Sequence, residues 1–465
     1  MNMNQKSFIV LIVASSFLFG CTSNPPKKDD VLNLALGKTE VLPQWSSQFT
    51  AGKFDEEALG FSLDAKLQSL IKEAINNNLD LRQARARVEQ SKGVLAATSG
   101  QRQPNIGIGA QAGTSTIPTA TSGISGAGLI ASWELDVWGK IASASNASEA
   151  RLNATDLDRV YAQQSIAASV IKSWIAITEA SQQVNLYQNL VKFAKNQNQL
   201  LIQGEKVGRN SQQDVNLNAA NIDSYQNQLL AYQTQLNQAK RSLEILLGRY
   251  PAAEIEASQK FPQPILDIPA GIPSEILSRR PDVLAAQQKY NAAFYDTEEA
   301  KRARLPSLKL SAGVAYIGES ALLLSSGINN PITSVTGQLL FPLFMGGQLQ
   351  ANQDIKTAKQ EEVLAQYAKV SLNAFSEVEY ALDNDKKLKL RQDSLESQVN
   401  NMQKALDFER NKFQVGKSDQ FQVLQQEIVL ANAQSNLNRL SSERLMNRVS
   451  LHQALGGHFM NGVTP

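Results

Sequence analysis

Residues 127–139, AGLIASWELDVWG, decide the fold, because the period of a β-strand gives way within them to a long helical stretch. Apolar side chains alternate with others up to Val137, as in a strand with one apolar face. From Gly139 to about Gln203 the chain then has no proline and almost no glycine. At about 1.5 Å per residue, such a helix would be roughly 100 Å long. The sequence therefore predicts a strand that continues into a very long helix.

The same order of residues occurs a second time, about 202 to 208 positions later. Four matches carry this duplication: Leu79-Asp80-Leu81 with Pro281-Asp282-Val283, Pro104 with Pro306, Val207-Gly208 with Val415-Gly416, and Leu247-Gly248 with Leu455-Gly456. Between them, residues 135–139 (LDVWG) correspond to residues 341–344 (FPLF) followed by Gly346. Four ordered matches with a drift of only six residues indicate a duplicated unit of about 200 residues.

The sequence of each unit predicts the same series of helices and strands. A helical stretch (65–101 and 274–304) precedes a strand that starts after Pro104 or Pro306. Loops of small residues (114–125 and 318–331) lead to a return strand, and the strands are about as long as tilted membrane strands. The long helices (139–203 and 346–413) end at Gly208 and Gly416, and shorter helices (211–247 and 418–455) return.

The returning helices carry apolar residues at alternating spacings of three and four, which predicts left-handed coiled-coil packing along a narrow seam. The first helix has Val215, Ile222, Tyr225, Leu229, Tyr232, Leu236, Ala239, Leu243 and Leu246 in this phase. The second has Val423, Leu430, Ala433, Leu437, Leu440, Leu451 and Ala454.

Composition narrows the possible functions. The 465 residues carry 45 Lys plus Arg against 43 Asp plus Glu, so no basic field favours nucleic acid. One cysteine excludes a disulfide framework, and two histidines, His452 and His458, make a histidine metal or acid–base site improbable; both are expected at the surface. We therefore expect neither an enzyme nor a metal site, and no cofactor besides a covalent lipid.

That lipid is expected on Cys21. Residues 7–19, SFIVLIVASSFLF, form an apolar run that is too short to span a bilayer and is typical of a signal peptide. The run ends in LFGC, which resembles a bacterial lipobox and implies cleavage before Cys21 with acylation of its sulfur. Thr22 rather than aspartate at the next position is similar to lipoproteins sorted to the outer membrane. The alternative is an ordinary signal peptide with an incidental cysteine.

These patterns divide the chain into six parts. They are a signal peptide (1–20), a lipidated N-terminal segment (21–64), the first repeat (65–248), a proline-rich connector (249–273), the second repeat (274–456) and a C-terminal tail (457–465).

Hydrogen bonding then predicts the assembly. Four membrane strands per chain leave two unpaired edges, and open edges are not tolerated in hydrocarbon. The smallest closed membrane barrels have about eight strands, so copies must combine, and three would supply twelve. We therefore expect an α+β membrane protein in which a trimeric 12-stranded β-barrel continues into a long α-helical barrel.

Several motifs together resemble the outer-membrane efflux protein family of TolC-like channels. They are residues 131–136 (ASWELD) with Trp138-Gly139, residues 280–283 (RPDV), Leu305-Pro306, and residues 341–344 (FPLF) with Gly346-Gly347. The lipobox is similar to the lipoprotein branch that serves resistance–nodulation–division multidrug pumps. The resemblance implies a homotrimeric duct, anchored in outer-membrane lipid and extending into the periplasm, whose tip docks onto a periplasmic adaptor linked to an inner-membrane pump.

The resemblance also implies where function resides, because a passive duct needs a gate rather than a catalytic group. Family members carry acidic residues shortly after the second Val-Gly turn, but Gln422 and Gln425 stand at those positions here. Phe421 could form an apolar constriction instead, or lie in the coiled-coil seam. Asp214 and Asp419 are the remaining gate candidates, and either could be a solvated surface carboxylate. The turns, with Gly208, Gly416 and Lys417, are the candidate adaptor contacts.

Trp133 and Trp138 are expected in an interfacial aromatic girdle or in a packed strand–helix junction. For the whole chain, the leading function is passive export of drugs or other small toxic compounds. A type I secretion exit duct for polypeptides, a metal-ion efflux duct, and a structural lipoprotein that bridges envelope layers are the alternatives.

Overall fold

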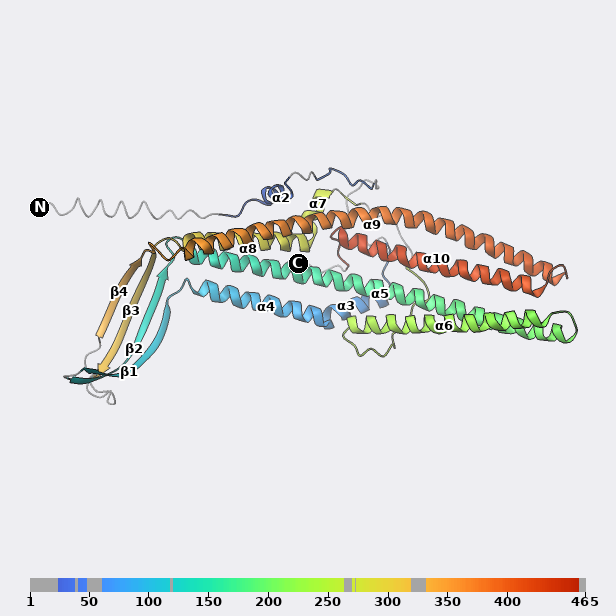
Figure 1. Cartoon of the computed structure of the whole chain (residues 1–465), viewed down its shortest axis with the longest axis horizontal. Coiled ribbons are helices and arrows are strands. Elements are labelled where there is room, and N and C mark those ends of the chain that lie inside the picture. The colour runs from blue at the N-terminus through green and yellow to red at the C-terminus, as the bar shows by residue number, and fades with distance from the viewer. Residues whose placement is uncertain are drawn as a thin grey trace. The chain divides into compact units, whose positions relative to one another are not determined.

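The computed structural model describes residues 24–37, 41–47, 61–117, 120–262, 270–271, 273–318 and 332–459. Its elements (Figure 1) are α2 (Lys28–Leu36), α3 (Ala65–Asn77), α4 (Leu79–Gly100), β1 (Asn105–Ile117), β2 (Ala120–Leu135), α5 (Lys140–Lys206), α6 (Gln212–Leu246), α7 (Pro273–Arg279), α8 (Pro281–Arg302), β3 (Ser307–Gly318), β4 (Ile332–Leu340), α9 (Gln348–Gln414) and α10 (Gln420–Ala454).

The chain divides into two compact units. The first, which we call the strand unit, contains all four strands and lies within residues 1–39, 86–157 and 284–370. The second, which we call the helical unit, contains α6, α10 and the C-terminal parts of α5 and α9, within residues 40–85, 158–283 and 371–465.

The duplication is visible in the lengths of the elements. Helices α5 and α9 each have 67 residues, α6 and α10 each have 35, and in both pairs the partners begin 208 positions apart. Helices α4 and α8 each have 22 residues and begin 202 positions apart, as do β1 and β3. The six extra residues of the second repeat therefore lie between the start of β3 and the start of α9. The duplicated α+β architecture predicted from the sequence is confirmed.

The four strands form one antiparallel sheet in the order β1-β2-β3-β4. The register places apolar side chains on one face, where Leu308 lies opposite both Leu135 and Leu339. Polar side chains occupy the other face, where Glu134 lies opposite Lys309. Within the described residues, β1 and β4 each pair along one side only, so both edges of the sheet are open.

One predicted loop is wrong. The small residues 114–125 were expected to connect the first two strands, but β1 continues to Ile117 and β2 begins at Ala120, with Ser115 opposite Ser122. Glycine is a weak strand former but threonine favours strands, so small size alone was a poor indicator of a loop, and cross-strand pairing extends the sheet through these residues. The second loop, 318–331, lies outside the described residues except for Gly318, which ends β3.

Each expected leading helix is interrupted once. Asn78 separates α3 from α4 with an extended backbone, and its Oδ1 accepts hydrogen bonds from the amides of Asp80 (2.9 Å) and Leu81 (3.2 Å). Asn78 therefore caps α4. Arg280 separates α7 from α8, because Pro281 disfavours helical backbone at the residue before it.

The core of the helical unit lies where α3, α5, α6 and α10 meet. Trp174, Ile171 and Ile175 of α5 pack there with apolar side chains of the other three helices. The predicted coiled-coil seams are also present, since Val423, Leu430 and Leu440 of α10 are buried. None of the described helices combines the length and apolarity needed to cross a bilayer.

His452 was expected at the surface, and this prediction is wrong. Its side chain is fully buried in the helical unit, with Nε2 2.9 Å from the carbonyl oxygen of His458 and the ring packed edge-on against Phe459. The chain turns back on itself after α10 and covers His452, which helical periodicity alone does not reveal.

Candidate functional site

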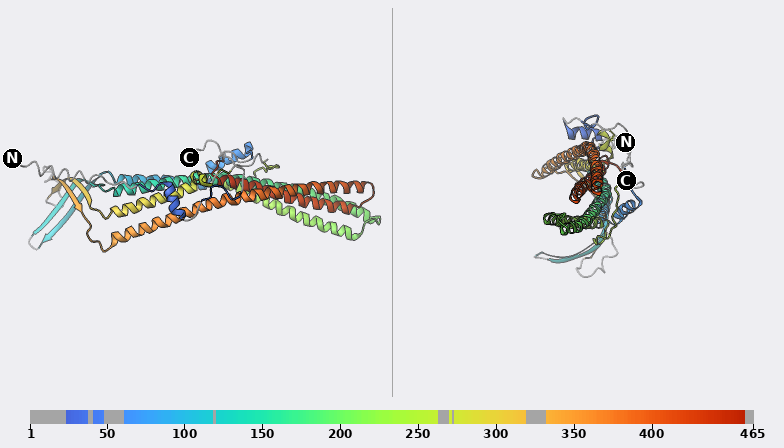
Figure 2. Two further views of the ribbon diagram at one scale, coloured as in Figure 1. Left: turned by 90° about the horizontal axis from the view of Figure 1, so that it is seen from above. Right: turned by 90° about the vertical axis from the view of Figure 1, so that its right-hand side faces the viewer.

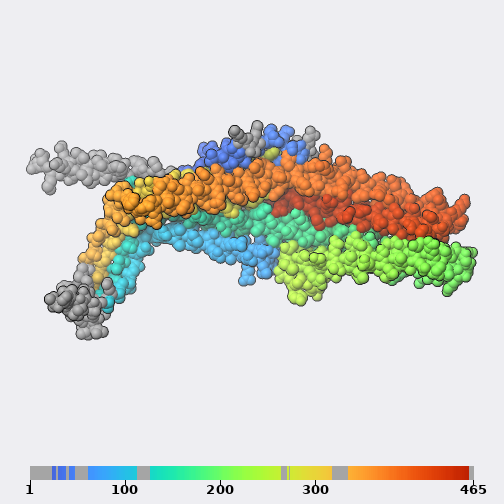
Figure 3. All heavy atoms as spheres, in the orientation of Figure 1, coloured from blue at the N-terminus to red at the C-terminus, as the bar shows by residue number. Residues whose placement is uncertain are grey.

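The two turns that join each long helix to its returning helix lie at the same end of the helical unit (Figure 1; Figure 2). In the space-filling view the α5–α6 and α9–α10 hairpins pack side by side at this end (Figure 3). We call this end the tip. It brings together the candidate gate and adaptor residues from the two repeats.

Both tip turns have the same backbone geometry. Gly208 (φ +75°) and Gly416 (φ +72°) adopt the left-handed conformation that glycine tolerates best. In each turn the next residue donates its amide to a carbonyl five positions earlier: Arg209 to Gly204 (2.8 Å) and Lys417 to Lys412 (2.9 Å). These are Schellman-type ends, which satisfy the last carbonyls of α5 and α9.

The candidate adaptor residues Gly208, Gly416 and Lys417 are all exposed at these turns. Val207 and Val415, which precede the two glycines within the predicted turns 206–210 and 414–419, are also strongly exposed. The two turns therefore expose an apolar side chain at the same position.

The two candidate gate carboxylates both cap helices. Asp214 forms a capping box with Ser211, whose backbone amide (3.0 Å) and hydroxyl (2.8 Å) donate to its Oδ2. These hydrogen bonds from Ser211 lower the pKa of Asp214. Asp419 is the N-cap of α10 and accepts from the amide of Gln422 at 2.8 Å. Both carboxylates therefore satisfy amides at a helix start.

Phe421, Gln422 and Gln425 lie in the first two turns of α10. Phe421 and Gln425 are half-buried, and Gln422 is exposed. The buried seam next to them is made by Val423 and Leu430 with Leu406 of α9, and Phe421 is not part of this cluster. The ring of Phe421 thus remains partly uncovered in one chain.

Polar contacts at the tip join helices that are distant in sequence. The side-chain amide of Gln420 donates to that of Gln197, which links α10 to α5, and Arg410 of α9 pairs with Glu427 of α10. Sequence reasoning missed these residues, because nothing in their spacing separates them from the many solvated polar residues around them.

Two further polar groups of the tip were also missed. The fully buried amide of Asn218 in α6 donates to the carbonyl oxygen of Ala194 (3.0 Å) and to Asn198 Oδ1 (3.2 Å), both in α5. Asn218 falls three residues after Val215 and four before Ile222, so the seam spacing could have identified it as a buried asparagine. Glu409 accepts from the Ser418 hydroxyl, which lowers the pKa of Glu409.

At the strand end, both candidate girdle tryptophans are bonded to backbone. Trp133 Nε1 donates to the carbonyl oxygen of Arg102 (2.9 Å), and Trp138 Nε1 donates to that of Pro306 (2.7 Å). Trp138 is half-buried, so it belongs to a packed strand–helix junction. The candidate lipidation residue, Cys21, lies outside the described residues. In the described part of the chain, no three His, Cys, Asp or Glu side chains group as a metal site.

Two export proteins are similar to this chain in sequence over most of its length. OpmQ of Pseudomonas aeruginosa, a pyoverdine export outer membrane protein, is 29% identical over 484 residues, which cover 98% of this chain and 97% of OpmQ. CusC of Escherichia coli K12, a cation efflux system protein, is 29% identical over 413 residues, which cover 85% of this chain and 88% of CusC.

Solved structures share the fold. The open state of the Neisseria gonorrhoeae MtrE outer membrane channel matches with a TM-score of 0.83 at 23% identity, covering 96% of this chain and 100% of that one. The family model for outer membrane efflux proteins matches residues 70–249 and again residues 272–457. The chain therefore belongs to the outer membrane efflux protein family.

Proposed function

We propose that three copies of this chain form the outer-membrane channel-tunnel of a tripartite efflux pump, which passively exports drugs or other small toxic compounds. The observation that carries this proposal is the four-stranded sheet, whose two edges are open and whose apolar face is exposed. The match to the outer membrane efflux protein family supports the proposal that this sheet lies in the outer membrane.

The number of copies follows from closing the sheet. Each open edge would leave amide and carbonyl groups without partners in hydrocarbon, so the strands must close into a barrel. Four strands fall short of the roughly eight that the smallest membrane barrels need, whereas three chains supply about twelve. The long helices follow the same rotation and continue the barrel as a helical tube.

The remaining assignments concern partners and anchoring. Acylation of Cys21 would hold the N-terminus in outer-membrane lipid, and the tip would extend into the periplasm. There the exposed Val207 and Val415, with Lys417, offer a surface for the periplasmic adaptor of an inner-membrane pump. The two family matches, 70–249 and 272–457, support a division into repeats at 65–248 and 274–456 with a connector between them.

Such a duct performs no bond chemistry, and the inner-membrane partner supplies the free energy. The chain itself must hold the tip closed and let it open. Closure is supported by the Gln197–Gln420 and Arg410–Glu427 contacts between helices. The ring of Phe421, which is partly uncovered in one chain, would narrow the aperture once three copies meet, and a narrow apolar ring gates by dewetting.

A metal-ion efflux duct is the second candidate, because CusC, named for cation efflux, has the same 29% identity to this chain as OpmQ, over a shorter match. Deleting the gene and measuring cellular accumulation of ethidium, copper ions and a siderophore separates these cargoes. The proposal predicts that ethidium accumulates and that the intact gene restores its export. Accumulation of copper alone would support the second candidate, and accumulation of none of the three would contradict an efflux role.

A further inference from the structure

The four strands of the sheet carry very little charge. Their sequences contain one acidic residue, Glu134 of β2, and one basic residue, Lys309 of β3. The two residues lie opposite each other in the β2–β3 register, on the polar face of the sheet. They also lie close to the helices, because β2 ends at Leu135 and β3 begins at Ser307. The charge of the sheet is therefore concentrated in one cross-strand pair at its helical end.

A third charged residue joins this pair. The ammonium group of Lys140, the first residue of α5, forms an ion pair with the carboxylate of Glu134. Lys309 is exposed and makes no ion pair with any residue that the structure describes. Whichever lysine Glu134 pairs with, two ammonium groups stand against one carboxylate. This part of the strand unit therefore carries one uncompensated positive charge per chain.

The three charged residues line a pocket of about 290 Å³ on the polar face, which we call the polar pocket. Asn105, Ser132 and Ser311 also line it, and the register places them side by side across β1, β2 and β3. Gln101 and Gln103 enter it from the turn between α4 and β1. Side-chain amides and hydroxyls donate hydrogen bonds, as ammonium groups do. The polar pocket thus offers donors from three strands and a turn around its positive charge.

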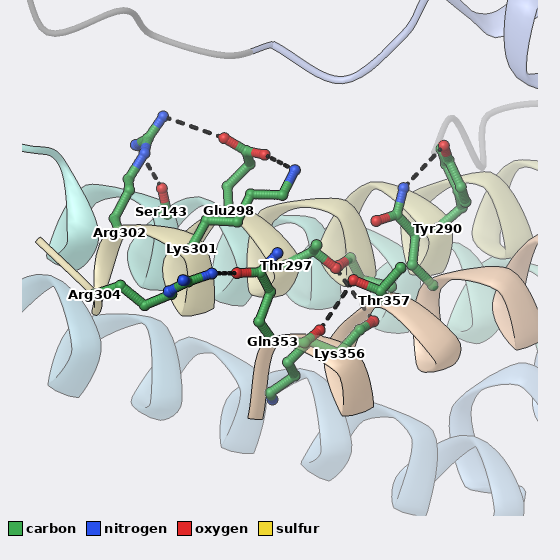
Figure 4. Close-up of polar contacts among 12 residues, drawn as sticks. Ser143, Tyr290, Thr297, Glu298, Lys301, Arg302, Arg304, Gln353, Lys356 and Thr357 are labelled. Atoms are coloured by element: carbon green, nitrogen blue, oxygen red, sulfur yellow. Dashed lines mark hydrogen bonds and ion pairs between the residues drawn. The ribbon is translucent and has the colours of Figure 1, made fainter. Parts of the chain in front are cut away.

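The structure around the polar pocket is held by hydrogen bonds to backbone and side chain. Trp133 Nε1 donates to the carbonyl oxygen of Arg102 at 2.9 Å, which ties the turn with the two glutamines to β2. Arg302 of α8 donates to the carbonyl oxygen of Gly139 (2.9 Å) and to Ser143 Oγ (2.7 Å; Figure 4). The second group of contacts holds the start of α5. The donors of the polar pocket are therefore carried by elements that are fixed to one another.

A further carboxylate nearby is already bonded elsewhere. Asp136 lies between β2 and α5, where its Oδ1 accepts from the amide of Ile141 (2.9 Å) and its Oδ2 accepts from the amide of Ala142 (2.7 Å). The charge of Asp136 is thereby balanced by the partial positive charge at the start of α5. The excess positive charge of the polar pocket remains.

We infer that the polar pocket binds small anionic solutes, with the ammonium group of Lys309 as the principal contact. The inference rests on the proposed function, because the polar face lines the water-filled lumen in a closed barrel whose apolar face meets lipid. Three copies place three such pockets on the lumen wall, in the path of the cargo. The polar pocket thereby names a class of cargo that the duct favours, namely small molecules that carry a negative charge.

The effect on transport is a preference among cargoes. An uncompensated charge acts over roughly one screening length, which is about 8 Å at physiological ionic strength. Anions that reach the wall are held there by charge-assisted hydrogen bonds, whereas cations further from the wall still pass. The polar pocket therefore ranks cargoes by charge and does not exclude cations such as ethidium.

Block of single-channel current by citrate tests the site in the full-length protein in planar bilayers. Citrate, added on both sides, is expected to reduce the current of the parent channel. Lys309→Gln should raise the half-blocking citrate concentration at least about tenfold, because a charge-assisted hydrogen bond is lost. Lys309→Arg keeps the charge and should retain most of the block. Equal block of the parent and of Lys309→Gln would overturn the inference.

A second substitution in the polar pocket is expected to act in the opposite direction. Glu134→Gln removes the only carboxylate that lines the pocket, so its half-blocking citrate concentration should fall below that of the parent. Lys359→Gln is the matched control, because Lys359 is an exposed lysine of α9 that lies outside the pocket and pairs with Glu362. Its block should equal that of the parent. A loss as large as that of Lys309→Gln would assign the effect to general surface charge and contradict the site.

Failure of this inference and failure of the proposed function give different results. If the parent chain is monomeric in mild detergent and forms no channels, the proposed function itself fails. If the parent conducts but citrate does not block it, or blocks every variant equally, the anion site is wrong and the duct stands. Light scattering of each variant confirms that it still assembles, so that a change in block reports on the pocket.

Discussion

The two carboxylates of the tip that were candidates for the gate both have a structural role at a helix start. From its position after the Val-Gly turn, Asp419 was a candidate gate charge, yet it caps α10, and Asp214 does the same for α6 within a capping box. The first amides of a helix lack partners inside the helix and require an acceptor. A charge placed there already has a structural role before any cation approaches it, and its part in gating stays a proposal.

The cap made by Asp214 is expected to depend on pH. Hydrogen bonds from Ser211 lower the pKa of Asp214 in the folded chain. The contribution of this cap to stability is therefore complete above the ordinary aspartate pKa of about 4, and it is lost as the pH falls through the lowered pKa. Amide hydrogen exchange in the first turn of α6 should accelerate in that acidic range. Asp214→Asn should remove this pH step, and a step that persisted in the variant would assign it to another group.

Phe421 is the residue on which the gate proposal depends most directly. Phe421→Ala is expected to raise single-channel conductance in planar bilayers, because it removes part of an apolar constriction. Leu424→Ala, at a fully packed position three residues later, is the matched control and should affect stability more than conductance. Unchanged conductance of the Phe421 variant would place that ring in the seam.

At the level of elements, α9 and α10 are held together by a charged cluster inside the helical unit. Asp385 of α9 and Arg448 of α10 are both buried, with Arg448 Nε 3.2 Å from Asp385 Oδ1. Arg444 approaches the same carboxylate at 3.9 Å. Buried charges tolerate little displacement, so this cluster sets how the two helices align along their seam.

Removing the acid of this cluster is expected to destabilise the fold. Asp385→Asn leaves two arginines without their counter-charge, at a cost of about 3–5 kcal/mol for breaking a buried pair. The double variant Asp385→Leu with Arg448→Met should lose less, because it also removes the more deeply buried of the two arginines and leaves only Arg444 without this counter-charge. Thermal unfolding in detergent compares the two, and a double variant less stable than the single one would show that the cluster is net stabilising.

At the level of the whole molecule, the open sheet edges and the duplicated elements lead to the same conclusion from different directions. Hydrogen bonding requires that β1 and β4 find partners, and three copies with four strands each supply them.

Lipid anchoring is expected to be separable from this assembly. Cys21→Ser should abolish acylation, measured by incorporation of labelled fatty acid, while trimers still form, because closure depends on the strands. Retained labelling in the variant would show that the lipid is elsewhere or that Cys21 is not its site. Loss of trimers together with labelling would show that the anchor is needed for assembly.

Much of the fold was predictable because it depends on short-range periodicity. The positions of Gly208 and Gly416, the strand alternation around Trp133, and the seam residues of α10 all follow from spacing along the chain. The strand pairing through residues 114–125 did not, because their small size was interpreted as a loop, whereas the cross-strand partners extend the sheet through them. The gate candidates could be located from the sequence, but their side-chain partners could not.

The sequence by itself thus determined the duplication, the order of the main elements, the length of the long helices, and the family, since repeated spacing is a property of the linear chain. Only the tertiary structure decided that His452 is buried, that Asp385 pairs with Arg448, and that Gln197 meets Gln420. The physical reason is sequence separation. These contacts form between segments that folding alone brings together, and one polar residue among many carries no local mark of the partner it will find.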